Sequence, residues 1–267
     1  MIVDHDVHVH TNLSSCCHDP DFEPPAAVAL AAELGLRTIG FANHCWDAAV
    51  GGASDWYAPQ TIDHVLRARE QLPADTQGVR VLVGCETEYC GGGKFGISPA
   101  GAERLDFVLI PHSHFHMAGF TVPADLHRSE DVARLLVQRF DEVVASGLAT
   151  GIAHPFVTLG FEDGLDAILS LISEQQYRDC FGRAAEAGVS VELHTGMFPS
   201  IAGNQKGYTD ETFLRIMGFA KDAGCAFHFT TDAHDLATLR NVVKLEPFAE
   251  KLGITAEDVS PAFRSAE

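Results

Sequence analysis

The sequence has few basic residues: 18 lysines and arginines stand against 37 aspartates and glutamates, which gives a net charge of −19. Such an acidic chain is poorly suited to holding a long polyanion, so no stable nucleic-acid partner is expected. It also has no run of about 18 or more apolar residues, so no transmembrane helix or membrane partner is expected. The opening residues, MIVDHDVHVH, lack the basic and apolar regions of a secretory signal.

The seven cysteines include no CxxC pair, and their number is odd. This pattern does not fit a disulfide framework, which indicates a reducing compartment and a cytoplasmic protein. Cys16, Cys17, Cys45 and Cys85 are expected to be small loop or core residues rather than metal ligands. No Ser/Gly linker, charge block or low-complexity tract divides the chain, so residues 1–267 are expected to form one metallohydrolase domain.

What the sequence has instead is histidine and acidic residues, which follow its apolar, strand-like runs at the point where each run ends. These residues are His8, His10, His44, Glu86, His112, His114, His154, His194, Asp232 and His234. If the strands run parallel, their ends meet at one rim, so the side chains would converge there. Neutral imidazoles mixed with a few carboxylates make a transition-metal site, which indicates a metal-dependent hydrolase.

Strand-like and helix-like segments alternate along the chain. Helices are predicted over residues 24–35, 61–72, 129–147, 172–188, 210–224 and 239–253. The alternation predicts an α/β fold with a parallel sheet and helices outside it. Because ligands follow nearly every strand, a closed barrel is favoured over an open sheet, and about seven strands can be counted. We therefore expect a distorted (β/α)₇ TIM-like barrel with the metal site at the C-terminal ends of the strands.

The two-residue period of a strand sharpens the prediction for the first strand. His8 and His10 share one face and should point together into the barrel mouth. Asp6 lies one step deeper on that face and is expected to accept the second N–H of a ligating imidazole.

Six motifs, in the order HVHTNLSSCCH, FANH, VGCE, IPHSH, AHP and TDAH, resemble those of the polymerase-and-histidinol-phosphatase (PHP) superfamily of metal-dependent phosphoesterases. The resemblance extends over about residues 6–234. It implies a distorted (β/α)₇ barrel and a trinuclear centre of three divalent ions, for which zinc, manganese and iron are all suitable. It also implies nine metal ligands: His8, His10, His18, His44, Glu86, His114, His154, Asp232 and His234.

Within this set, the resemblance implies that Glu86 bridges two of the ions. His8, His10, Glu86 and Asp232 would hold one ion, Glu86, His114 and His154 a second, and His18, His44 and His234 a third. The HSHFH segment offers His112, His114 and His116 where one ligand is needed. His114 is favoured because the sequence Ser-His-Phe, with this histidine in the middle, looks most like the family's pattern.

The function that these features predict is release of phosphate from a small phosphorylated metabolite, histidinol phosphate being one possibility, by attack of a metal-bridging hydroxide. Glu86 and Asp232 are the expected catalytic carboxylates, and His194 is a further candidate for substrate contact or proton supply. Lys206 resembles a substrate-binding basic position of related phosphatases, and Lys94 is a second candidate by its loop position.

Two alternatives remain at the level of the sequence. One is an amidohydrolase-like reaction, because the same activated water could attack a carbonyl carbon. The other is a metal-bound barrel without catalytic activity that serves as a binding module. The sequence fixes neither the substrate nor the oligomeric state.

Overall fold

The computed structural model of the chain describes residues 2–203 and 207–264. Nine strands in this part form the centre of the molecule: β1 (His5–Val9), β2 (Thr38–Phe41), β3 (His44–Cys45), β4 (Arg80–Val83), β5 (Cys85–Thr87), β6 (Val108–Pro111), β7 (Gly151–Ala153), β8 (Ser190–His194) and β9 (Phe227–Thr230). Every pairing between these strands is parallel. β3 continues the course of β2, and β5 that of β4, so the nine strands occupy seven places.

The strands close into a barrel through two hydrogen-bonded sheets. The first has the order β1-β2-β4, and the second has the order β3-β5-β6-β7-β8-β9. β9 returns to lie beside β1, where the backbone N of His10 donates to the carbonyl of Ala233 at 2.9 Å. This arrangement confirms the predicted distorted barrel with seven strand positions.

The barrel is distorted at Gly84, between β4 and β5. A Cβ atom at this position would collide with the carbonyl oxygen and the ring of Phe107, so only glycine lets the two segments approach this closely. Gly84 still donates to the carbonyl of Phe41, whereas the next residue, Cys85, donates to that of Phe107. The chain therefore leaves one sheet and enters the other at this glycine.

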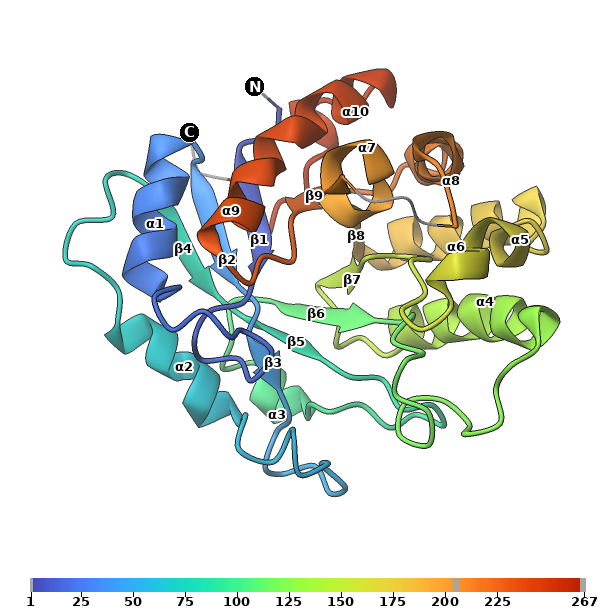
Figure 1. The fold of residues 1–267 in the computed structure, drawn as a ribbon, viewed down its shortest axis with the longest axis horizontal. Helices are drawn as coiled ribbons and strands as arrows, with labels where there is room; N and C mark the ends of the chain where they lie inside the picture. Colours follow the sequence, from blue (N-terminus) through green and yellow to red (C-terminus); the bar gives the residue numbers. More distant parts are fainter. Residues whose placement is uncertain (1, 204–206, 265–267) are drawn as a thin grey trace.

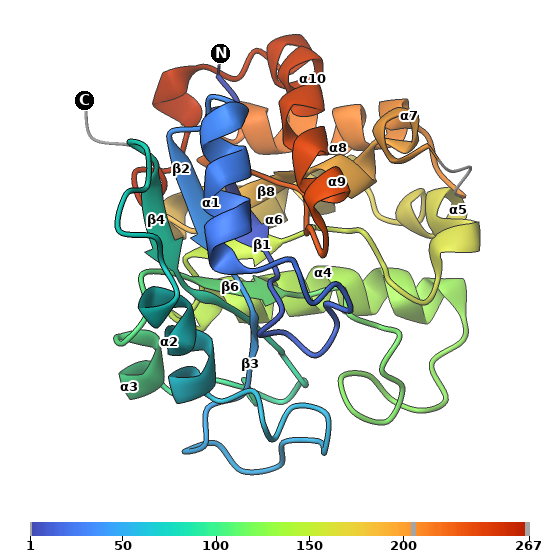
Figure 2. The same ribbon diagram turned by 60° about the vertical axis from the view of Figure 1, so that its left-hand side comes forward.

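Helices surround the barrel in both views of the molecule (Figures 1 and 2). They are α1 (Pro24–Glu33), α2 (Ile62–Glu70), α3 (Pro99–Ala102), α4 (Ser129–Ala145), α5 (Leu165–Leu169), α6 (Glu174–Ala187), α7 (Pro199–Ala202), α8 (Asp210–Asp222), α9 (Leu236–Leu239) and α10 (Glu246–Lys251). The predicted helices are present, except that the last one is broken into α9, a 3₁₀ segment over Arg240–Leu245 and α10. Pro247 lies in the first turn of α10, where its missing N–H needs no partner within the helix, so it fits the start of a new helix there.

Helix α4 shows how the helices bury their apolar faces. Val132, Leu136, Phe140 and Val143 recur every three or four residues, and none of them is exposed to solvent. They belong to a large apolar cluster that joins the helices to the strands. Among the described residues, no helix has the length and hydrophobicity needed to cross a membrane. The helices thus cover the outer faces of the strands, and the histidine and acidic side chains lie at the ends of the strands.

Candidate metal centre

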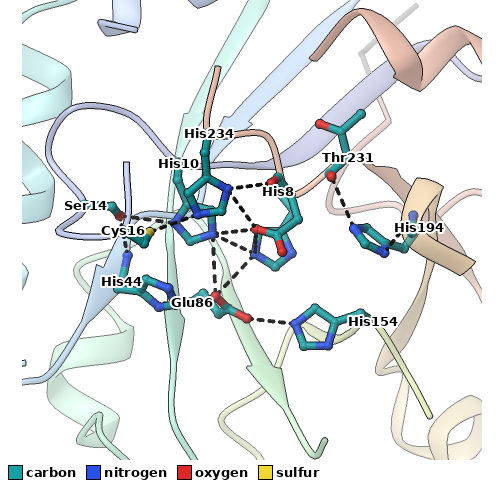
Figure 3. Close-up of polar contacts among 12 residues, drawn as sticks. His8, His10, Ser14, Cys16, His44, Glu86, His154, His194, Thr231 and His234 are labelled. Atoms are coloured by element: carbon teal, nitrogen blue, oxygen red, sulfur yellow. Dashed lines mark hydrogen bonds and ion pairs between the residues drawn. The ribbon is translucent and has the colours of Figure 1, made fainter. Parts of the chain in front are cut away.

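Histidine and acidic side chains from the C-terminal ends of the strands meet in one place (Figure 3). They come from β1 and the residue after it, from β3 and β5, and from the segments after β6, β7 and β9. The group contains His8, His10, His44, Glu86, His114, His154, Asp232 and His234. Convergence of these side chains from parallel strand ends is what the sequence pattern predicts.

Glu86 lies between two groups of imidazoles. Its Oε1 atom is 3.1 Å from Nε2 of His154 and 3.5 Å from Nε2 of His114. Its Oε2 atom faces the other way and is 3.4 Å from Nε2 of His8 and 3.5 Å from Nε2 of His10. One carboxylate thus presents one oxygen to each group, which is the arrangement that a residue bridging two metal ions needs.

The first group is His8, His10 and Asp232, whose ligand atoms all lie within 4.8 Å of one another. The Nε2 atoms of the two histidines are 3.1 Å apart. Oδ1 of Asp232 is 3.0 Å from Nε2 of His10. Asp232 has a backbone φ of 53°, in the left-handed region that non-glycine residues rarely adopt. Such strained residues cluster at functional sites, where the surroundings hold them in place.

The second group is Glu86, His114 and His154, which meet the same 4.8 Å criterion. The Nε2 atoms of the two imidazoles are 3.2 Å apart. Nδ1 of His154 contacts Oγ of Ser113 at 3.2 Å, which leaves Nε2 directed at Glu86. Each imidazole therefore directs Nε2 toward Glu86, while its Nδ1 contacts a side chain that fixes the ring, Ser113 for His154 and Glu88 for His114.

A buried carboxylate that the sequence analysis missed, Glu192 in β8, orients two members of the centre. Its Oε1 atom is 2.8 Å from Nδ1 of His8, and its Oε2 atom accepts a hydrogen bond from the backbone N of His154. The sequence had predicted this role for Asp6, and that prediction is wrong. Asp6 instead accepts hydrogen bonds from the hydroxyl and backbone N of Thr231 and from the backbone N of His8, where the register of β1 shifts.

Glu88 is the corresponding carboxylate for the second group and was also missed. Its Oε1 atom is 2.7 Å from Nδ1 of His114, and the same oxygen accepts a hydrogen bond from the hydroxyl of Tyr57. Carboxylates that hold the outer nitrogen of a ligating imidazole fix its tautomer and its orientation. Both groups therefore have a buried acid behind a histidine.

Burial and neighbouring charges set the protonation of the centre. Burial lowers the pKa of His10 to about 4 and that of His44 to about 3, so both imidazoles are neutral at pH 7. Burial alone raises the pKa of Glu86, but nearby imidazoles, above all His8, outweigh it and hold this pKa well below its usual value. Burial also opposes protonation of His114, yet Glu88 and Glu86 raise its pKa to about 9. His114 must therefore lose a proton when it binds a metal ion.

The predicted third group differs from the one in the structure. His18 lies exposed on its loop, and the structure does not bring it to the other ligands. Cys16 takes that place, within 4.8 Å of ligand atoms of His10 and His44. Its Sγ atom is also 3.0 Å from Nε2 of His234.

Neither a family model nor a curated protein matches this sequence. Solved structures do match. Histidinol phosphate phosphatase HisK from Lactococcus lactis subsp. lactis Il1403, solved with zinc, L-histidinol and phosphate, is 16% identical with a TM-score of 0.57, and the match covers 94% of each chain. A candidate histidinol phosphatase HisK from Listeria monocytogenes is 12% identical with a TM-score of 0.62, covering 88% of this chain and 96% of that one.

A third match is a chain in the structure of archaeal ribonuclease P with mature tRNA, at 15% identity and a TM-score of 0.50, covering 97% of this chain and 87% of that one. The chain has the PHP fold. The resemblance that the sequence motifs indicated is thus confirmed at the level of the fold. The clusters of histidine and acidic residues at the strand ends of this PHP barrel are candidate metal sites.

Of the two lysines predicted to bind substrate, the structure describes only Lys94, which lies away from the candidate metal ligands. Lys94 is exposed, and its Nζ atom lies 5.2 Å from the centre of the Trp46 ring. It does not line the cavity beside the metal ligands. Lys206 lies outside the described residues.

His194 ends β8 as predicted, but backbone groups occupy both of its ring nitrogens. Nε2 is 3.2 Å from the carbonyl oxygen of Thr231, and Nδ1 accepts a hydrogen bond from the backbone N of Gly196. Burial lowers its pKa, so the ring is neutral at pH 7. Figure 3 shows it beside Thr231 and apart from Glu86, although its ring centre is 6.0 Å from that of His154.

A cavity of about 240 Å³ opens beside the centre of the PHP barrel. Glu86, Asp232 and several of the histidines line it on one side. Trp56, Tyr57 and Met117 contribute an aromatic and apolar wall. Among the described residues that line this cavity, none is lysine or arginine. Apart from protonated imidazoles such as that of His114, only bound cations can balance the negative charge of an anionic ligand here.

We expect His114→Ala to lower the metal content per chain, whereas His112→Ala and His116→Ala leave it near the wild-type value. Nδ1 of His112 contacts the carbonyl of Leu136 at 3.1 Å, and its Nε2 accepts from the backbone N of Phe156 at 2.9 Å, so neither nitrogen is available. His116 is exposed at the edge of the cavity. Metal analysis of the three purified variants distinguishes them, and a loss confined to His112→Ala would show that the wrong histidine was chosen.

Proposed function

We propose that this protein is a metal-dependent phosphomonoesterase that acts on small phosphorylated metabolites. The observation that carries the proposal is the placement of Glu86, with one carboxylate oxygen toward each of two imidazole groups. When bound, divalent ions at these groups supply Lewis acidity and activate water for in-line attack on phosphorus. The chain's own contribution is to hold the ions at a fixed separation and to exclude bulk water from them.

The donor set fits divalent transition metals. His8, His10 and Asp232 would hold one ion, and His114 with His154 would hold the second, with Glu86 shared between them. Imidazole and carboxylate donors suit zinc, manganese and iron. The acids behind His8 and His114 fix the two rings, so little reorientation is needed when metal binds.

The cavity supports a small substrate. Its volume of about 240 Å³ suits a metabolite rather than a polymer. With no lysine or arginine among the described lining residues, the phosphoryl group is expected to be bound through the ions, while Trp56 and Met117 are placed to contact the rest of the molecule. The Lactococcus enzyme of the same fold was solved with zinc, L-histidinol and phosphate, so histidinol phosphate is the first substrate to test.

The protein is expected to release phosphate from monoesters far faster than it cleaves single-stranded oligonucleotides. The net charge of −19 repels long polyanions, whereas a small dianion can reach the bound ions. Phosphate release from a panel of monoesters, and nucleotide release from DNA and RNA, measure both rates on the metal-loaded protein. Chelation should abolish the first rate.

Other outcomes of this assay would replace the proposal. Cleavage of oligonucleotides at physiological salt with little monoesterase activity would assign the protein to a nuclease class. Hydrolysis of amides or lactones alone would indicate an amidohydrolase-like reaction. Metal binding without turnover of any of these substrates would leave a binding module.

A further inference from the structure

The side chain of Cys16 faces the metal centre together with His234 (Figure 3). Nδ1 of His234 is 2.8 Å from the carbonyl oxygen of Asp232, so this nitrogen carries the proton. The lone pair of Nε2 then accepts from the thiol of Cys16, whose Sγ atom lies 3.0 Å away. An imidazole lone pair and a thiol sulfur this close together form a pair of metal donors.

A buried nitrogen of His44 supplies an independent observation. Nδ1 of His44 makes no hydrogen bond within the described chain, although the residue is only 9% exposed. It lies 3.3 Å from Oε2 of Glu86, on the side of the centre that Cys16 faces. A buried, unpartnered ring nitrogen costs free energy unless a ligand occupies it.

The loop that carries Cys16 is held in place by several hydrogen bonds. Oδ1 of Asn43 accepts from the backbone N of Thr11 at 2.8 Å and from Oγ of Ser14 at 3.0 Å. The same Oγ accepts from the backbone N of His44 at 2.9 Å. The backbone N of Ser15 donates to Oε1 of the buried Gln60. The position of Cys16 is therefore fixed to the strand that provides His44.

The neighbouring Cys17 has a different role. Its sulfur donates to the carbonyl oxygens of His234 at 3.2 Å and Asp19 at 3.7 Å. It ties the loop to the turn after β9 and faces backbone rather than imidazole. Cys17 is thus a matched control for Cys16, with the same chemistry one residue away.

We propose that Cys16, not His18, is the third-site ligand of this protein, and that it binds a zinc ion through sulfur together with His44 and His234. The inference rests on the metal centre of the proposed function and adds a thiolate to it. On a tetrahedral zinc ion, a nitrogen and a sulfur ligand lie about 3.5 Å apart, close to the 3.0 Å between His234 and Cys16. The thiol gives its proton to solvent when the ion binds. A soft sulfur donor selects zinc over manganese at this position.

Cobalt substitution tests the proposal directly. Cobalt(II) bound to a thiolate gives a sulfur-to-metal charge-transfer absorption in the near ultraviolet, which imidazole and carboxylate ligands do not give. We expect this absorption in the wild type and in Cys17→Ser. In Cys16→Ser the absorption should be lost completely, and the variant should bind about one metal ion per chain fewer than the wild type. Cys16→His should restore the ion without the absorption, because it restores a donor but not the sulfur.

X-ray absorption of the zinc-loaded wild type provides a measurement that needs no variant. It should show sulfur scattering at about 2.3 Å from zinc. Absence of that shell, or an unchanged cobalt spectrum in Cys16→Ser, would overturn the assignment of Cys16. Loss of metal in His18→Ala alone would return the third ligand to His18.

These outcomes are separate from those of the proposed function. Phosphate release without any sulfur signal would overturn the role of Cys16 and leave the phosphomonoesterase intact. A sulfur signal without phosphate release from any monoester would overturn the phosphomonoesterase and leave the role of Cys16 intact.

Discussion

Glu86→Gln should lower metal-dependent phosphate release by about 100-fold or more, with the fold retained. Removing a residue that only supports a metal ligand costs about 10- to 100-fold, so loss of a shared ligand should reach at least the upper end of that range. Glutamine cannot replace the carboxylate, because its NH₂ group does not bind a metal ion, and only one of the two oxygen positions keeps a donor. Initial rates at saturating metal, with circular dichroism as the check on folding, measure the effect.

The matched control is Glu103→Gln, which removes the same charge from an exposed position. Its activity should equal that of the wild type. A folded Glu86→Gln variant with near-normal turnover would show that Glu86 does not bridge two ions.

Glu192→Gln should weaken zinc binding by about 10- to 100-fold, although Glu192 touches no metal in this account. Its two oxygens serve Nδ1 of His8 and the backbone N of His154, and an amide can accept from only one of them. One donor is then left without a partner in a fully buried position. Competition with a chromophoric chelator measures the affinity.

Asp6→Asn is the control, because the two-residue period of a strand was the only reason to assign this supporting role to Asp6. Asp6 contacts Thr231 and the backbone of β1, so its substitution should reduce thermal stability more than zinc affinity. A larger loss of zinc affinity in Asp6→Asn than in Glu192→Gln would contradict the geometry described for β8.

The fold was predictable because its signals are local. Apolar strand-like runs alternate with helical periods such as that of α4, and most runs end in a candidate ligand, as the run that begins in β4 ends at Glu86 in β5. The parallel order follows, and with it the convergence of the strand ends. The break at Gly84 was not predictable, because it depends on contact with Phe107, which precedes β6.

The supporting acids were missed although the sequence carries a signal for them. Glu192 lies in β8 two residues before His194, and Glu88 directly follows β5 two residues after Glu86; both neighbours had been singled out. A carboxylate inside a buried strand is costly unless it is paired, so its presence there indicates an imidazole partner. Which imidazole it contacts depends on the barrel's closure and cannot be read from one strand.

The loop after β1 shows where the sequence is insufficient. Cys16 and His18 are two residues apart, and turns decide which side chain faces the centre. Asn43, which fixes that loop, lies between β2 and β3. The register shift in β1 also involves a distant segment. The backbone N of Thr231, just after β9, donates to Asp6, and β1 departs there from the regular alternation of side chains between its two faces.

The most direct test of the account is a metal titration of the stripped wild-type protein, in which bound metal per chain and phosphate release are measured on the same samples. We expect no release from the stripped protein, and release that appears as the sites around Glu86 fill with zinc or manganese. The Glu86→Gln variant should remain inactive throughout the titration. Phosphate release that is unchanged by stripping, or a fully loaded wild type that releases no phosphate from any monoester, would contradict the central claim.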